Sequence, residues 1–325
     1  MAEREFLYLS QADILELNLG MEEVIQIVEE DFRLKGRGLA KVPPKVGIDV
    51  GEKGYMHAMP AAVEPLGVSG IKWLSGYPRD PIRKLPHIMG LVILNDSATG
   101  VPMAVMDATW ITEARTPAVT ALGARYMARP ESRVAGVVGA GRQGKNNAIA
   151  LAKVLPLELI KVTDTDSDIL AQSAAEIAQQ TDALVEAVAS PREAVEGSDV
   201  VVTAIPWTGK PTPVVEDEWL GGGAFAAPVD LDQAWPPGIY KRVDRFATDD
   251  VGQMVAFHAH GSFAGGLPPM IELADIVLGK VPGRERPEER TMLVHLGIAI
   301  HDVAVAKRLY ELAFHGGVGT WLPWM

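Results

Sequence analysis

Three glycines between a short apolar strand and a helix constrain the fold of this chain more than any other feature. Gly139, Gly141 and Gly144 form a G-x-G-x-x-G pattern after the apolar run 133–138 and before a helical pattern that continues to about residue 154. In this setting the first glycine permits a tight turn, the second lets the backbone approach a pyrophosphate, and the third lets the helix pack closely on the strand. The helix N-terminus offers N–H groups and partial positive charge to phosphates. The pattern therefore predicts a dinucleotide site.

Strand and helix patterns alternate after this loop. Apolar β-type runs at 159–163, 183–187, 199–204 and 224–228 are interrupted by helical patterns at 169–180 and 191–196. Such alternation is typical of a parallel sheet with helices on both faces. We therefore expect an α/β protein whose larger domain is a doubly wound Rossmann dinucleotide-binding fold.

The acidic residues after the second strand of this domain bear on the choice of cofactor. Asp164 closes the strand, 25 residues after Gly139, where a carboxylate can accept hydrogen bonds from the adenosine ribose hydroxyls. Asp166 and Asp168 follow, and the cluster would repel the extra phosphate of NADP, although Arg142 and Lys161 are nearby. We expect NAD(H) as the cofactor, and a solvated acidic loop at Asp166 and Asp168.

The N-terminal part of the chain has a different pattern. A helix is predicted from Ser10, a suitable N-cap, to about Gly36, with a break near Gly20. Within residues 41–110 we then expect mainly strands and turns, which are listed here: β-type runs at 46–50, 70–74, 90–94 and 101–106, with a hairpin turn at 94–100. This segment is small for a complete sheet, and an open strand edge would favour pairing with a second copy, so we expect a homodimer.

Two longer helices connect these parts. The pattern at 112–128 contains Pro117, which is tolerated in a first turn, so this helix is expected to start near Arg115. A last helix, from Thr291 to about Phe314, is expected to return toward the N-terminal domain. We therefore expect a smaller α+β substrate-binding and dimerisation domain made of residues 1–128 and 303–325, and an NAD-binding domain at 129–302.

Composition limits the possible partners. The formal net charge of −12 argues against general affinity for nucleic acid or an anionic membrane. No apolar run is long enough to span a membrane, and the first residues do not have the pattern of a signal peptide. The chain has no cysteine, which excludes disulfides and thiolate metal sites and fits a cytoplasmic protein. His258 and His260 lack a third ligand at a telling spacing, so we expect no metal site.

Motifs over nearly the whole chain, in order, resemble those of the ornithine cyclodeaminase/μ-crystallin family. The segments that carry the resemblance are Met59-Pro60-Ala61, Gly70-Ile71-Lys72-Trp73, Leu94 to Pro102, Met106-Asp107-Ala108, Ile111-Thr112, Arg115-Thr116, Val137 to Gly144, Gly283-Arg284, Leu296-Gly297-Ile298-Ala299 with Asp302, and Gly319-Thr320-Trp321-Leu322. Their joint order and spacing make chance agreement very improbable. The resemblance implies an enzyme that holds the carboxylate of a small amino or imino acid near the nicotinamide.

The resemblance also implies roles for individual residues. Arg115 would bind the substrate carboxylate, for which a guanidinium offers a bidentate fork. Lys72 would touch the substrate and relay a proton, with a pKa that desolvation lowers into a useful range. Lys45 stands where many members have an arginine that also holds the carboxylate. For the cofactor, the implied residues are Thr116, Arg142, Gln143 and Gly297, beside the three loop glycines and Asp164.

Two of the departures from the family pattern bear on the substrate. Asp232 lies where the cyclodeaminases have an aspartate that accepts a proton from the substrate amine, but Asp230 replaces the usual glycine, so either carboxylate is a candidate. His57 stands where the ornithine-cyclising members have a glutamate that holds the distal amine. An imidazole is a poor partner for an ammonium and a better one for a carboxylate or hydroxyl.

Three functions are compatible with these features of the sequence. The favoured one is an NAD(H)-dependent imine reductase or amino-acid dehydrogenase that transfers hydride at the carbon bonded to nitrogen. The alternative is a cyclodeaminase, which uses NAD catalytically and releases ammonia. The third is a nucleotide-binding protein without catalysis, of the μ-crystallin type.

Overall fold

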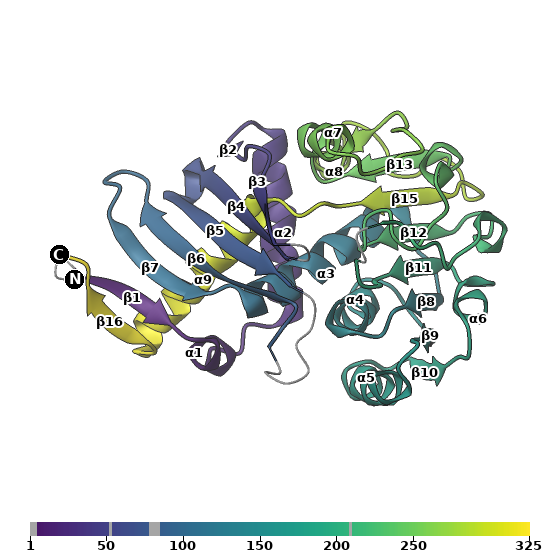
Figure 1. The fold of residues 1–325 in the computed structure, drawn as a ribbon, viewed down its shortest axis with the longest axis horizontal. Coiled ribbons are helices and arrows are strands. Elements are labelled where there is room, and N and C mark those ends of the chain that lie inside the picture. The colour runs from purple at the N-terminus through teal and green to yellow at the C-terminus, as the bar shows by residue number, and fades with distance from the viewer. Residues whose placement is uncertain (1–4, 52–53, 78–84, 208–209) are drawn as a thin grey trace. The chain divides into compact units, whose positions relative to one another are not determined.

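A computed structural model of the chain describes residues 5–51, 54–77, 85–207 and 210–325 (Figure 1). The backbone divides into two compact units, one made of residues 1–115 with 298–325 and the other of residues 116–297. The sequence predicted domain boundaries at 128/129 and 302/303. The divisions between the two units, at 115/116 and 297/298, both lie earlier in the chain.

The second unit contains a parallel sheet in which the glycine-rich loop follows a central strand. Its strand order is β10-β9-β8-β11-β12-β15-β13-β14. The strands are β8 (Val134–Val138), β9 (Leu159–Thr163), β10 (Leu184–Ala187), β11 (Val200–Thr203), β12 (Phe225–Pro228), β13 (Arg245–Thr248), β14 (Ile271–Glu272) and β15 (Thr291–Val294). After β8 the chain builds β9 and β10 on one side and then crosses to β11 on the other, so the loop after β8 lies where the winding reverses. Ligands bind at such switch points in doubly wound sheets.

The sequence explains why these strands lie in the interior. The run Val-Val-Val-Thr of β11 is buried at every residue, as parallel strands covered on both faces require. The helices and helical turns of this unit are α4 (Arg142–Ala152), α5 (Ser167–Gln180), α6 (Pro191–Val195), η2 (Asp217–Trp219), η3 (Ile239–Lys241), α7 (Val251–Ala259) and α8 (Leu273–Val277). The predicted doubly wound α/β fold is confirmed.

The first unit is built on a mostly antiparallel sheet with the order β16-β1-β7-β6-β5-β4-β2, and β3 also pairs with β4. Its strands are β1 (Glu5–Leu9), β2 (Ala40–Lys41), β3 (Val46–Val50), β4 (Gly54–Val63), β5 (Val68–Gly76), β6 (Ile88–Asp96), β7 (Pro102–Asp107) and β16 (Thr320–Pro323). Near the chain ends, β1 pairs with β16 (Figure 1).

Helices and a helical turn accompany this sheet in the described part of the unit. They are α1 (Gln11–Glu16), α2 (Met21–Gly36), η1 (Glu64–Leu66), the first part of α3 (Thr109–Met127) and α9 (Ala299–Gly316). The helix α9 packs against β4, β5, β6 and α2. Ser10 caps α1 with a capping box, and the predicted break near Gly20 separates α1 from α2.

Two predicted helix starts are wrong. The helix with Pro117 begins at Thr109, because the carboxylate of Asp107 accepts the N–H groups of Thr109 (3.0 Å) and Trp110 (3.3 Å) and so caps the helix there. Pro117 therefore lies inside α3, near the division between the units. Thr291 to Val294 form the buried strand β15, and the last helix begins only at Ala299. Four apolar residues in sequence fit a buried strand as well as a helix turn.

Within the described residues, no helix is long and apolar enough to cross a membrane.

Candidate active-site residues

A lysine and an aspartate from distant parts of the chain form an ion pair in the interior of the first unit. Lys72 Nζ, on β5, donates to Asp302 Oδ1, on α9, at 2.7 Å, and both side chains are 0% exposed. Lys72 Nζ also lies 3.4 Å from Thr112 Oγ1. The burial of Lys72 comes from α9, since its strand neighbour Trp73 points to the opposite face and is 41% exposed.

Arg115 joins this pair from α3. Its Nε lies 3.3 Å from the same Asp302 oxygen, and the residue is 6% exposed. Within the described chain, no hydrogen bond reaches the terminal guanidinium nitrogens of Arg115 or the second carboxylate oxygen of Asp302. The planar fork of Arg115 is therefore available to a carboxylate ligand.

The electrostatics of this cluster shift two pKa values. Burial lowers the pKa of Lys72 to about 8, the charge of Arg115 also lowers it, and Asp302 opposes both effects. Burial, followed by the positive charges of Lys45 and Lys72, lowers the pKa of His57 to about 4. Lys72 can thus exchange a proton near neutral pH, and His57 is neutral there.

Packing fixes the ring of His57 on β4. The ring centroid lies 4.7 Å from that of Tyr55, and a Cβ added at Gly47 on β3 would lie 2.8 Å from His57 Cδ2. A side chain at position 47 would therefore displace the imidazole. Lys45, just before β3, is partly buried and acts on His57 as a positive charge. Of the residues expected to bind or process the substrate, Lys45, His57, Lys72 and Arg115 belong to the first unit, and Asp232, with its alternative Asp230, belongs to the second.

The glycine-rich loop of the second unit has the geometry that a pyrophosphate requires. Gly139 has a φ of +94°, and a Cβ there would lie 2.6 Å from the carbonyl oxygen of Ala204. A Cβ on Gly144 would lie 1.8 Å from the Gly139 oxygen. Gly141, the N-cap of α4, has a φ of −60°, which any residue adopts. Backbone strain therefore gives no reason for a glycine at this position.

The acidic residues after β9 have separate tasks. Asp164 Oδ2 accepts the Ala140 N–H at 2.6 Å, and Oδ1 accepts the Asp166 N–H at 3.0 Å. Asp166 is the N-cap of α5 and accepts the N–H groups of Asp168 and Ile169. Lys161 donates to the carbonyl of Glu196 at 2.8 Å. Its ammonium is therefore bonded to the backbone and is not directed at a phosphate. Only Asp164 among these acids contacts the loop directly.

Asp230 and Asp232 follow β12, and both are 8% exposed. Asp230 accepts the Thr203 hydroxyl at 2.9 Å and the Ile205 N–H at 3.0 Å, both at the end of β11. Burial raises the pKa of Asp230 to about 7, although these two bonds lower it. Asp232 Oδ2 accepts the Phe263 N–H at 2.6 Å. Both carboxylates thus have bonds to the protein, and either remains a candidate.

The remaining cofactor candidates lie on two helices and one loop. Arg142 and Gln143 begin α4, and Thr116 is buried within α3. Gly297 has a φ of +81°; its N–H donates to Asp249 at 2.7 Å and its carbonyl accepts from Gln253 at 2.9 Å. The Gly297 loop is therefore held from both sides. Both of these bonds lie within the second unit.

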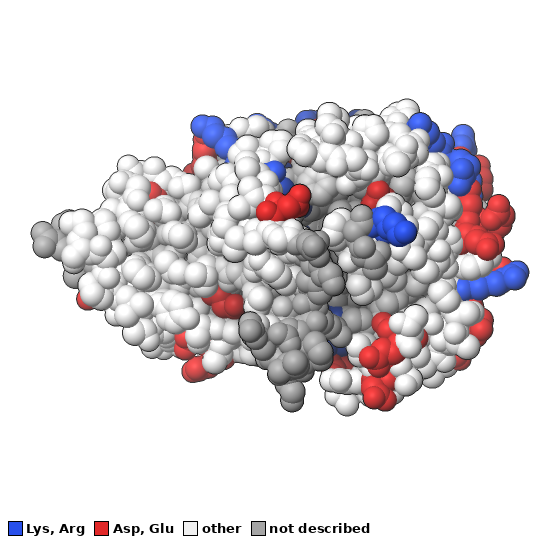
Figure 2. All heavy atoms as spheres, in the orientation of Figure 1, with Lys and Arg blue, Asp and Glu red and all other residues white. Residues whose placement is uncertain are grey.

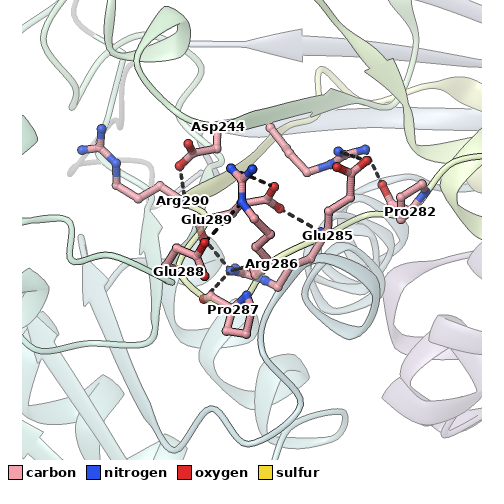
Figure 3. Close-up of polar contacts among 10 residues, drawn as sticks. Asp244, Pro282, Glu285, Arg286, Pro287, Glu288, Glu289 and Arg290 are labelled. Carbon is pink, nitrogen blue, oxygen red and sulfur yellow. Dashed lines mark hydrogen bonds and ion pairs between the residues drawn. The ribbon is translucent and has the colours of Figure 1, made fainter.

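Two motifs noted in the sequence have structural explanations. His258 Nδ1 and His260 Nδ1 lie 3.0 and 2.7 Å from carbonyl oxygens of their own segment, and the part of the chain that the structure describes contains no group of metal-ligating side chains. Arg284 donates to the carbonyl of Met127, the last residue of α3, at 2.9 Å. The segment around it, residues 282–290, is held by polar contacts within the segment and by a hydrogen bond from Arg290 to Asp244, as Figure 3 shows. The Gly283-Arg284 motif thus anchors a helix end.

Asp302 is the residue whose place in this cluster the sequence did not reveal. The family motifs included Asp302 but predicted no role for it, because its partner Lys72 is 230 residues away in the sequence. An acidic residue in the first turn of the helix, directly before the apolar run 303–306, was the available signal.

A switch-point glycine loop in one unit and an interior cluster of two cations around one carboxylate in the other define a Rossmann-type dinucleotide-binding enzyme. The chain belongs to the ornithine cyclodeaminase/mu-crystallin family, whose sequence model matches residues 5–317. The expected family is thus confirmed.

Individual similar proteins match nearly the whole chain. The alanine dehydrogenase of Archaeoglobus fulgidus is 35% identical over 97% of this chain and 98% of its own length. The Delta(1)-pyrroline-2-carboxylate reductase of Thermococcus litoralis, solved with NADH and L-proline, superimposes with a TM-score of 0.87 at 31% identity, covering 97% of this chain and 99% of that one. An archaeal alanine dehydrogenase dimer with bound NAD also gives 0.87 at 31% identity, over 99% of this chain and 100% of that one.

Proposed function

We propose that this protein is an NAD(H)-dependent oxidoreductase that transfers hydride at the carbon bonded to nitrogen in a small amino or imino acid. The observation that carries the proposal is the buried cluster of Lys72, Asp302 and Arg115, which offers a proton donor and a carboxylate-binding fork. The names of the relatives, an alanine dehydrogenase and a pyrroline-2-carboxylate reductase, support the same class of reaction.

The substrate carboxylate binds to Arg115, with Lys45 as a second positive charge. Arg115 turns its Nε toward Asp302, which leaves the terminal nitrogens for a bidentate contact. Burial lowers the pKa of His57 most, and the positive charges of Lys45 and Lys72 lower it further, so two cations beside this ring would favour an anionic group of the substrate. The neutral imidazole of His57 then contacts the uncharged part or a hydroxyl or carboxylate of the substrate, and a distal ammonium is disfavoured.

Lys72 moves the proton at the substrate nitrogen. With a pKa of about 8, its ammonium donates a proton in the reductive direction and its neutral amine accepts one in the oxidative direction. Asp232 is the second candidate for this task, with Asp230 as its alternative. The nicotinamide, when bound, supplies or accepts the hydride, and the residues of this chain orient the substrate and hold its charges.

The cofactor is NAD(H), held by the loop of Gly139, Gly141 and Gly144. Thr116, Arg142, Gln143 and Gly297 are the further cofactor ligands that we propose. The carboxylate of Asp164 adjoins the loop, as its bond to Ala140 indicates, and its negative charge disfavours the extra phosphate of NADP. Residues 129–302 are proposed as the NAD-binding domain, and residues 1–128 with 303–325 as the substrate and dimerisation domain.

The homodimer that we propose forms through the sheet face that α9 leaves bare. Six large apolar side chains share this face by strand register and are 36–66% exposed: Tyr8, Val46, Ile48, Trp73, Leu91 and Ile93. Figure 2 shows few charged atoms over the strands of this sheet. An apolar patch of this kind marks an interaction surface, and a symmetric pairing of two copies covers it. The absence of cysteine supports a cytoplasmic location.

A paired absorbance screen at 340 nm, the absorption band of reduced nicotinamide, tests this function. One arm offers NADH, 2-oxo acids and ammonia or methylamine, together with cyclic imino acids; the other offers NAD⁺ and amino acids, including ornithine. We expect stoichiometric loss of NADH in the first arm and formation in the second. Release of ammonia from ornithine without net NADH would support the cyclodeaminase instead, and NAD binding without turnover would support a binding protein.

A further inference from the structure

The buried position of Asp302 is not explained by stability. Its partner Lys72 is flanked on the neighbouring strands by Met59 and Val92, which are 2% and 0% exposed. Burying two or three charges costs several kcal/mol per ion, and apolar residues of similar volume often serve a fold equally well or better. A cluster of charges in this place therefore points to a use in function.

The contacts of Asp302 are also uneven. One oxygen, Oδ1, serves both Lys72 at 2.7 Å and Arg115 at 3.3 Å, while Oδ2 has no hydrogen bond from the described residues. An arrangement selected only to satisfy charges would use both oxygens. Here the shared oxygen instead fixes the separation between the ammonium and the guanidinium.

The helix supports this arrangement. Asp302 is in the first turn of α9, where the helix dipole favours a negative charge. The preceding residue, His301, points elsewhere and lies 3.1 Å from Asp31 of α2, which fixes α9 against its neighbour. Asp302 is therefore held by a rigid element, as a group that positions others must be.

We propose that Asp302 is a positioning residue that holds Lys72 as a proton donor at a fixed place beside the Arg115 fork. This rests on the proposed function, in which Lys72 handles the substrate nitrogen and Arg115 the carboxylate. Because these two substrate groups are attached to the same carbon, their two protein partners must keep a fixed separation. The charged groups that face Lys72 are Asp302 from α9 and Arg115 from α3, and its own charge acts on His57 of β4.

Asp302→Asn keeps the shape and removes the charge. Burial and Arg115 then act on Lys72 without opposition, so the pKa of Lys72 should fall by at least about one unit, the usual effect of one adjacent opposite charge. The high-pH limb of the reductive pH profile should move to lower pH by the same amount. The KM for the carboxylate substrate should rise, because the Arg115 fork loses its fixed orientation.

Two measurements on the full-length protein test this. NMR of the Lys72 Cε–H signals in lysine-¹³C-labelled protein, assigned by comparison with Lys72→Met and followed across pH, gives the pKa of this buried amine without any substrate. Asp31→Asn is the control for the substitution itself, since it makes the same exchange at another buried aspartate of the same unit, which contacts His301 instead of Lys72. Asp302→Glu, which restores the charge, should recover part of the wild-type profile.

The outcomes separate the two proposals. A lower Lys72 pKa together with a shifted pH limb in Asp302→Asn, and neither change in Asp31→Asn, is the expected result. An unchanged Lys72 pKa in a folded Asp302→Asn protein overturns the positioning role. A lower Lys72 pKa with an unmoved limb means that Lys72 is not the proton donor, which overturns both this inference and that part of the proposed function.

Discussion

Asp164 Oδ2 accepts a 2.6 Å hydrogen bond from the Ala140 N–H, so the carboxylate after β9 is tied to the glycine-rich loop after β8. The same side chain that is proposed to choose the cofactor therefore also holds the loop that binds it.

Asp164→Ser should weaken NAD⁺ binding and narrow the gap to NADP⁺, because the variant loses both the loop bond and the negative charge. Titration of each nucleotide, followed by intrinsic fluorescence, measures both affinities. Asp168→Asn is the control, since it removes a charge from the same segment and leaves the Ala140 bond intact. A wild-type protein that binds or uses NADPH better than NADH would contradict this interpretation of Asp164.

The Lys72 amine should give the enzyme opposite pH dependences in its two directions. Its pKa is about 8, so the ammonium is available below that pH and the neutral amine above it. The reductive rate should fall as the pH rises through about 8, and the oxidative rate should rise over the same range. Initial rates between pH 6 and about 10 in both directions check this.

Lys72→Met should lower turnover with every substrate, because a proton relay acts on the reacting nitrogen whatever the rest of the molecule is. NAD⁺ binding should stay nearly normal, since Lys72 is outside the glycine-rich loop. Near-wild-type turnover of the variant would exclude Lys72, and Asp230, Asp232 and His57 would be tested next.

Arg115→Lys should lower catalytic efficiency by roughly ten- to a hundredfold. The variant keeps a positive charge and loses the bidentate fork, and a charge-assisted hydrogen bond contributes about 1.5–3 kcal/mol. The loss should be much smaller for a substrate analogue without the carboxylate. Steady-state kcat/KM for the two compounds, with wild type and variant in parallel, measures the difference, and an equal loss for both would contradict carboxylate binding by Arg115.

His57 should make folding stability depend on pH. Its folded-state pKa of about 4 lies below the ordinary 6.5, so the unfolded chain binds the proton more readily between these values. The free energy of unfolding should therefore fall as the pH falls from about 6.5 to about 4. Urea unfolding of wild type and His57→Gln at pH 7 and 5 isolates this contribution, and an identical pH dependence of the two proteins would contradict it.

The parts of the fold that the sequence predicted are those with local signals. The loop glycines and the alternation after residue 132 identified the Rossmann core, because the period of apolar residues and the turn residues agree there. The strands β1 and β4 were not predicted. The strand β1 pairs with β16 from the far end of the chain, and pairing between such distant segments leaves no local pattern in the sequence. The helix α3 starts earlier than predicted because Asp107 caps it at Thr109. Pro117, which usually lies in the first turn of a helix, is therefore inside α3.

The candidate site divides in the same way. Single motifs and the family resemblance pointed to Lys72, Arg115 and the glycine loop. The lowered pKa of Lys72 was expected from its neighbours Ile71 and Trp73, yet α9 buries it, and the ion pair with Asp302 spans 230 residues. The directions of the two candidate acids, Asp230 and Asp232, depend on the loop conformation at Leu231, whose φ of +65° is not predictable from its residue type.

Leu91→Glu should shift the protein from dimer toward monomer, because it places two buried carboxylates in a symmetric interface. Leu91 is 44% exposed beside Trp73 on the apolar sheet face. Leu184→Glu, at an exposed leucine of β10 in the other sheet, is the matched control. Size-exclusion chromatography with light scattering gives the mass, and a wild-type value of 34.9 kDa at micromolar concentration would contradict the dimer.

Transfer of deuterium from [4-²H]NADH to the product tests the central claim most directly. The wild-type protein is incubated with the deuterated cofactor of each stereochemistry and the active imino acid or 2-oxo acid with amine, and the product is analysed by mass spectrometry. We predict one deuterium on the carbon that bears nitrogen, with one NAD⁺ formed per product. Product without deuterium from either form of the cofactor, or turnover without net NAD⁺, would contradict an amino/imino acid oxidoreductase.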